Sequence, residues 1–155
     1  MPYEYIEEVL TVAGEQPDVR FLFMTKNPKR YFDVVCEDSA GTLANCTLGA
    51  TVESDANYPK LSKAPPQSDR LHHMTKLSEL GVKTFVSVEP ILDFTPGFET
   101  DLYRIRPWAV AVGYDNYKNY LPEPSLKRTQ DLISKLRKAG ITVYEKTLRK
   151  AWYEP

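Results

Sequence analysis

The sequence predicts an α/β protein with a five-stranded, mostly parallel sheet and flanking helices. Two observations predict this class: helix-like and strand-like segments alternate along the chain, and the strand-like segments are short, nearly continuous apolar runs. Such runs are typical of parallel strands, so we expect both faces of the sheet to be buried. The chain has 155 residues, and we predict one domain over residues 1–155.

The helices are predicted from amphipathic spacing and from the residues that start and stop them. In chain order they cover 3–14, 27–35, 70–80, 99–105 and 125–140. Pro28 suits the first turn of the second helix, and Ser68 or Asp69 is a candidate N-cap of the third. The last helix has the clearest apolar face, with Ser125 as its cap and Gly140 as its stop.

The strands are predicted from apolar runs rich in β-branched and aromatic residues. They cover 20–25, 46–53, 83–90, 108–114 and 141–146. The proline-rich segment 54–67 and the segment 115–124 are predicted loops, and residues 147–155 form a short helix or a tail. Right-handed crossovers leave two architectures, an open doubly wound sheet or an arc of a partial (β/α) barrel.

Composition and charge restrict the classes of function. Apolar residues make up 42% of the chain, charged residues 26%, and the net charge is −1, so nucleic acid is not indicated. The sequence has no apolar run of roughly 18–20 residues and no signal-peptide pattern, which predicts a cytoplasmic protein with no membrane contact.

The Cys36–Cys46 spacing and the adjacent His72 and His73 fit no metal site, and the cysteines are expected to be reduced structural thiols. A flavodoxin-like nucleotide binder ranks lowest because no strand is followed by a glycine-rich phosphate loop.

Polar residues recur where the predicted strands end. The strand ends carry Thr25 and Lys26, Thr51 and Glu53, Ser87 and Glu89, Tyr114 and Asn116, and Glu145 and Lys146. In both architectures the carboxyl ends of parallel strands form the ligand site, so we interpret these residues as one polar pocket. The alternative is that they form loop hydrogen bonds and salt bridges, such as one between Lys26 and Glu53.

Glu89 is the most unusual of these residues, because a carboxylate followed by Pro90 ends a buried strand. An unpaired carboxylate there would carry a large desolvation cost. We therefore predict that Glu89 is ionised at the pocket rim and is held by a cation, with Lys146 or Lys26 as the partner.

Six segments form a pattern in chain order: FLFMTKNPKRY (21–31), LGATVES (48–54), Arg70-Leu71, FVSVEPILDF (85–94), WAVAVGYDN (108–116) and VYEKTL (143–148). Together they resemble a phage- and prokaryote-encoded family of radical S-adenosylmethionine (SAM)-like proteins. The resemblance implies the C-terminal portion of a partial TIM-like barrel.

The resemblance also implies roles for the strand-end residues. Four would line the pocket and contact the amino, carboxylate or ribose groups of SAM: Thr51, Glu53, Ser87 and Glu89. Six would contact the substrate or complete the pocket: Thr25, Lys26, Arg70, Tyr114, Asn116 and Lys146. The lysines would serve a substrate anion or pair with the glutamates.

The chain departs from the family in two respects. It has no C-x3-C-x2-C motif, whose three thiolates would hold a [4Fe–4S] cluster, and it lacks roughly the first half of the barrel. We therefore expect no cofactor on this chain alone; a cluster and SAM would require a cluster-bearing N-terminal half or upstream protein. An open sheet edge would permit a homo-oligomer. The alternative is a non-catalytic binding or remnant domain whose rim charges are structural.

Overall fold

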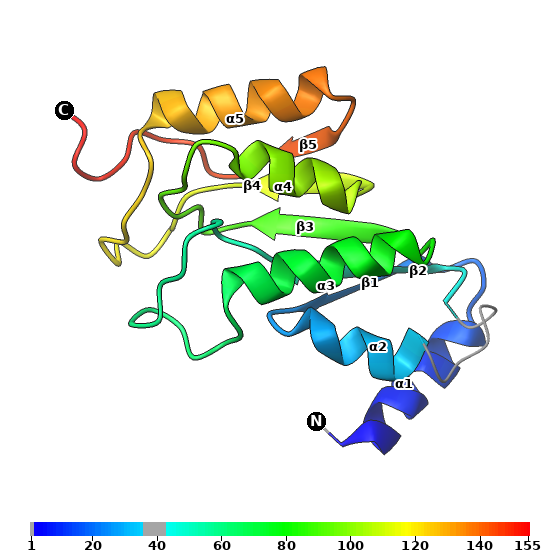
Figure 1. The fold of residues 1–155 in the computed structure, drawn as a ribbon. Helices are drawn as coiled ribbons and strands as arrows, with labels where there is room; N and C mark the ends of the chain where they lie inside the picture. Colours follow the sequence, from blue (N-terminus) through cyan, green and yellow to red (C-terminus); the bar gives the residue numbers. More distant parts are fainter. Residues whose placement is uncertain (1, 36–42) are drawn as a thin grey trace.

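The computed structural model describes residues 2–35 and 43–155 and shows an α/β fold around one parallel sheet (Figure 1). The elements follow the chain as α1 (Tyr3–Gly14), β1 (Phe21–Thr25), the 3-10 helix η1 (Pro28–Arg30), α2 (Tyr31–Val35), β2 (Cys46–Thr51), α3 (Gln67–Glu79), β3 (Thr84–Val88), α4 (Phe98–Ile105), β4 (Ala109–Val112), α5 (Leu126–Lys138) and β5 (Thr142–Glu145). The predicted alternation of helices and strands is confirmed.

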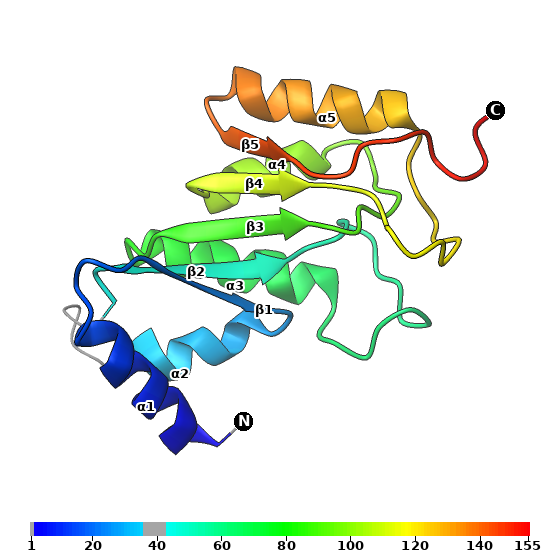
Figure 2. The same ribbon diagram turned by 180° about the vertical axis from the view of Figure 1, so that it is seen from behind.

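The order of the strands distinguishes between the two predicted architectures. The five strands lie side by side in chain order, β1-β2-β3-β4-β5, and every neighbouring pair is parallel. Right-handed crossovers that always step in the same direction put the connecting helices on one face. Helices α3 and α4 lie in front of the strands in Figure 1 and behind them in Figure 2. This is the arrangement of a barrel arc, whereas a doubly wound sheet reverses direction and has helices on both faces.

The main core lies between the sheet and these helices. Alternate strand residues, among them Leu48, Val86 and Val110, point to this side and pack with Met74 of α3 and Leu136 of α5. Each such side chain contributes about 1.5–3 kcal/mol by leaving water. Because side chains alternate along a strand, the residues between these core positions lie on the opposite face of the sheet.

The opposite face of the sheet is only partly covered, so the expectation that both faces are buried is wrong. Its central part is a small buried cluster of Phe85, Ala109 and Ala111. Toward the sheet edges, Met24 of β1 and Tyr144 of β5 are about half exposed, at 44% and 45%. We call this surface the open face.

Helix α1 is attached mainly at its C-terminal end. The Nδ2 atom of Asn45 donates to the carbonyl oxygens of Ala13, Gln16 and Val19 at 2.9, 3.0 and 3.0 Å. Only Leu10 and Ala13 of α1 are buried. The helix lies beyond β1, at that edge of the sheet (Figures 1 and 2).

The predicted helix caps are confirmed in one case and wrong in the other. Ser125 is the N-cap of α5 and accepts a hydrogen bond from the backbone N–H of Arg128. Helix α3 instead begins directly after Pro66, without a side-chain cap, so Ser68 lies inside the helix rather than at its cap. Residues 147–155 contain no helix. None of the helices in the described ranges has the length and apolarity that crossing a membrane requires.

Two glycines of the open face give a matched prediction about packing. An alanine Cβ at Gly113 would lie 2.7 Å from the Cβ of Lys146, an atom fixed to the backbone. At Gly49 the nearest atom would be the Sδ of Met24, which belongs to a flexible, half-exposed side chain that can turn away. We expect Gly113→Ala to lower the free energy of unfolding by about 1–3 kcal/mol and Gly49→Ala by less than about 1 kcal/mol. Urea unfolding of both variants tests this, and equal losses would contradict it.

Candidate functional site

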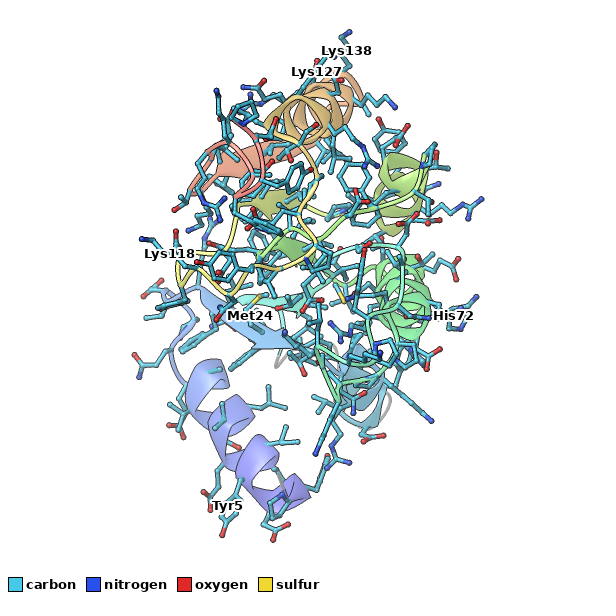
Figure 3. All side chains as sticks on the ribbon, turned by 90° about the vertical axis from the view of Figure 1, so that its left-hand side faces the viewer. Tyr5, Met24, His72, Lys118, Lys127 and Lys138 are labelled. Carbon is cyan, nitrogen blue, oxygen red and sulfur yellow. The ribbon has the colours of Figure 1, made fainter. Side chains whose placement is uncertain are left out.

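The candidate site lies at the edge where all five parallel strands end. Figure 3 looks onto this edge, with Met24 on the side of the open face and His72 of α3 on the side covered by helices. The strand ends followed by Lys26, Glu53, Glu89, Asn116 and Lys146 share this edge because the strands are parallel.

The carboxylate of Glu53 is the centre of a charged network at this edge. Its Oε1 lies 2.6 Å from Lys26 Nζ, and its Oε2 lies 2.6 Å from Arg70 Nη1 and accepts a hydrogen bond from Gln67 Nε2 at 2.7 Å. The side chains of Glu53 and Arg70 are only 5% and 2% exposed. This pairing confirms the alternative interpretation of Lys26 and Glu53 as a salt bridge.

Arg70 connects the network to the backbone. Its Nε donates to the carbonyl oxygen of Pro65 at 2.7 Å, and its Nη1 donates to that of Thr51 at 3.1 Å. The guanidinium thus joins the end of β2, the loop before α3 and the first turn of that helix. A planar group with five fixed donors suits this position, which a lysine could not fill in the same way.

The network keeps Glu53 ionised. Burial alone would raise the pKa of its carboxyl, but the hydrogen bonds from Lys26 and Gln67 outweigh that effect and lower the pKa below its ordinary value. The Glu53 network thus consists of one anion and two cations, and of its two cations Lys26 is the exposed one, at 45%.

A pocket of about 560 Å³ lies above this network, beneath the proline-rich loop. Its walls come from Lys26, Glu53, Asn57, Tyr58, Pro59, Leu61, Ser62, Lys63, Ala64, Pro65, Pro66, Gln67, Arg70, Pro90, Leu92 and Leu121. Pockets of this size accept small organic ligands. Gln67 is buried, and its Oε1 has no hydrogen-bond partner among the described residues.

A second group of predicted site residues faces the open side. Thr51 and Ser87 are neighbours in the β2–β3 register, on the same side as Phe85. Glu89 and Lys146 both flank Gly113: an alanine Cβ there would lie 3.3 Å from Glu89 Oε1 and 2.7 Å from the Cβ of Lys146. These residues thus line the C-terminal end of the open face.

The predicted ion pair of Glu89 is not formed. Lys26 pairs with Glu53 instead, and within residues 2–35 and 43–155 Glu89 has no ion pair or side-chain hydrogen bond. Glu89 is half-buried, and the peptide bond between Glu89 and Pro90 is cis. The premise of the prediction is a carboxylate fully removed from water, and a half-buried side chain does not meet it.

Three further predicted residues lie away from the pocket. Tyr114 is fully buried on the helix side, where its hydroxyl contacts Thr129 Oγ1 at 2.7 Å and donates to the carbonyl oxygen of Pro124. Burial raises its pKa to about 12. Thr25 Oγ1 accepts the backbone N–H of Asn27 in the turn after β1, and Asn116 is exposed in the loop after β4.

Sequence reasoning missed two buried polar residues at this edge. Gln67 was assigned to the end of a loop, although it begins α3 and bonds Glu53. Glu123, between two prolines, is buried against Arg149, with Oε1 2.7 Å from Nη2. The sequence did contain a signal for Glu123, because a carboxylate between two prolines is unusual in a predicted loop.

Only one of the two cysteines can be placed, because Cys36 lies outside the described residues. Cys46 is buried at the start of β2, its Sγ donates to Oδ1 of Asn45 at 3.5 Å, and burial raises the pKa of its thiol. The described residues contain no group of three His, Cys, Asp or Glu side chains placed to hold a metal ion.

Comparisons of this chain with protein-family models, with curated proteins and with solved structures find no match.

The Glu53 network gives a prediction about stability. Glu53→Gln removes the counter-charge of a fully buried guanidinium, so we expect the free energy of unfolding to fall by about 3–5 kcal/mol. Lys26→Met removes a partly exposed partner while the pairing of Glu53 with Arg70 remains, and should cost less than about 1 kcal/mol. Urea unfolding of both variants measures the difference; a larger loss for Lys26→Met would show that the buried pair is not the main contact.

The same network predicts a pH dependence. The folded-state pKa of Glu53 lies below its ordinary value, so its contribution to stability is present above about pH 4.3 and is lost as the pH falls through the folded-state pKa. The stability difference between the wild type and Glu53→Gln should therefore shrink between neutral pH and pH 3. Urea unfolding at several pH values tests this, and a constant difference would contradict it.

Proposed function

We propose that this domain is the C-terminal part of a radical SAM-type barrel and contributes a polar ligand pocket at the C-terminal ends of its strands. One observation carries the proposal: a parallel sheet has helices on one face, while the other face is open and lined by polar side chains at its C-terminal end. Parallel sheets are ordinarily covered on both faces. An open face therefore fits a barrel interior that other structure completes.

The side chains at this end suit a ligand such as SAM. The hydroxyls of Thr51 and Ser87 can donate to or accept from ribose and carboxylate oxygens, and the Glu89 carboxylate can accept from an ammonium or ribose hydroxyl. In this proposal Lys146 serves an anionic group of the substrate.

The residues of this chain do not fit a [4Fe–4S] cluster. Radical SAM-type ligation uses three closely spaced thiolates, and the sequence has two cysteines with nine residues between them. The cluster belongs, in this proposal, to an N-terminal half or an upstream protein. This chain would bind and orient the ligand without holding the metal.

A non-catalytic domain with structural rim charges is the second candidate. The observation that favours it is the network around Glu53, where Lys26 and Arg70 pair with a carboxylate of the same chain. Such a network stabilises the edge without any ligand. Glu89, which has no such partner among the described residues, is the position where the two functions predict different results.

Glu89→Gln separates the two functions. If Glu89 contacts the ligand, we expect about tenfold weaker SAM binding with an unchanged melting temperature, because the variant loses a charge-assisted hydrogen bond. Glu145→Gln is the matched control, since Glu145 also ends a strand but pairs with Arg137 of α5. Calorimetric titration of SAM and thermal melts of each protein provide the measurements.

The titration is done on the chain alone and again with the product of any adjacent reading frame that encodes C-x3-C-x2-C. A lower melting temperature for Glu89→Gln with no effect on SAM would favour the structural function. Absence of SAM binding in both settings would refute the proposed ligand.

A further inference from the structure

Four exposed aromatic rings gather on two segments beside the ends of β4 and β5. Tyr117 and Tyr120 lie in the loop 115–124 and are 85% and 70% exposed, while Trp152 and Tyr153 lie in residues 149–155 and are each 52% exposed. The rings of Tyr120 and Tyr153 each meet Trp152 edge to face at 5.6 Å. We call these four residues the aromatic patch.

A buried ion pair fixes the two segments to each other. Glu123 is 1% exposed, and its two oxygens lie 2.7 and 2.9 Å from the two terminal nitrogens of Arg149. Arg149 also donates to the carbonyl oxygen of Asp115 at 2.8 Å, and the backbone N–H of Trp152 donates to Glu123 at 3.2 Å. These contacts hold residues 115–124 and 149–155 in a fixed arrangement, which we call the base of the patch.

The polar atoms of two rings point into this base. Trp152 Nε1 donates to the backbone carbonyl oxygen of Leu121 at 2.7 Å. The hydroxyl of Tyr153 donates to the backbone carbonyl oxygen of Glu123 at 3.1 Å. Their hydrogen-bonding capacity is thus used internally, while half of each side chain remains exposed. What these rings offer to solvent is mainly apolar surface.

The loop that carries Tyr117 and Tyr120 is held in an unfavourable backbone conformation. Lys118 and Tyr120 have φ values of 56° and 52°, in the left-handed region that bulky side chains avoid. The Asp115 carboxylate maintains it by accepting from Asn119 N and Nδ2 at 2.9 and 3.0 Å. Conformations of this kind concentrate at functional sites.

The two segments carry both charges, and their lysines are the groups that an anionic partner would contact. Lysines are interleaved with the aromatic residues in both segments, as Tyr117-Lys118-Asn119-Tyr120 and Lys150-Ala151-Trp152, and Lys150 Nζ donates to the carbonyl oxygen of Pro155. The carboxylates of these segments are hydrogen-bonded within the chain: Asp115 and Glu123 as described, and Glu154 to the backbone N–H groups of Leu126 and Ala151. Lys118 has no ion pair among the described residues.

We propose that the aromatic patch binds single-stranded nucleic acid, with bases stacked on Tyr117, Tyr120 and Trp152 and phosphates contacted by Lys118 and Lys150. Exposed aromatic rings interleaved with cations are the usual means of binding single strands without sequence preference. The net charge of −1 does not indicate this partner, because it averages over the whole chain. The proposal requires neither SAM nor an upstream partner, so it stands or fails separately from the proposed function.

Tryptophan fluorescence tests the proposal directly. The chain has two tryptophans, and Trp108 lies immediately before β4, so Trp108→Phe leaves Trp152 as the only reporter. The probes are ten-residue oligothymidylate and oligouridylate, which separate DNA from RNA. We expect saturable quenching of Trp152, with log K falling against log salt at a slope of about −1.4 for two phosphate contacts.

Two variants and two controls accompany this titration. Tyr117→Ala removes the most exposed ring, and Lys118→Asn removes a charge while keeping a residue that tolerates positive φ. Each should weaken binding by about fivefold or more, given the usual stacking and phosphate contributions. The controls are Tyr5→Ala and Lys138→Asn; Figure 3 shows both positions far from Lys118.

Quenching that both variants weaken and both controls retain supports the proposal. Absence of quenching by either oligonucleotide, equal binding by variants and controls, or binding that salt does not weaken would overturn it. Circular dichroism of each variant checks that it is folded.

Discussion

The buried carboxylate of Glu53 holds together the edge of the sheet where the strands end. Its partners come from two other parts of the chain, Lys26 after β1 and Gln67 and Arg70 of α3, and Arg70 is also bonded to the loop before the helix. A buried charge is tolerated only when all its partners are in place. The loop, the start of α3 and the end of β2 therefore cannot move independently, and the pocket beneath the loop owes its shape to this constraint.

The fold was predictable because its signals are local. Apolar runs and glycine stops located every strand and most helices, and Ser125 marked the start of α5. The start of α3 was not predictable from cap residues, because Pro66 precedes the helix and Arg70 and Gln67 stabilise its first turn through Glu53. Tertiary contacts there replace the local capping that sequence reasoning looks for.

The candidate site was predictable only in outline. Parallel strands guaranteed that polar strand ends would share an edge, but not which side chains would face one another. Side chains alternate along β4 and the residues after it. Val110, Val112 and Tyr114 lie on the side of the helices, whereas Ala109, Ala111 and Gly113 lie on the open face. Alternation was visible in the sequence, yet the face that the helices cover depends on strand order, which no local pattern encodes. The sequence predicted the salt bridge between Lys26 and Glu53 only as an alternative to a ligand pocket. No local pattern shows which of the cations Lys26, Lys146 and Arg70 pairs with which carboxylate.

The attachment of α1 has a consequence for how the molecule opens. The side-chain amide of Asn45 bonds one carbonyl oxygen of this helix, that of Ala13, and two in the segment that follows, and only Leu10 and Ala13 of the helix are buried. The strands, in contrast, share ladder hydrogen bonds and a continuous core. Regions with few buried apolar contacts detach at a fraction of the global unfolding free energy. We therefore expect helix α1 to open as a separate unit, so that its amides exchange with solvent while those of the sheet remain protected.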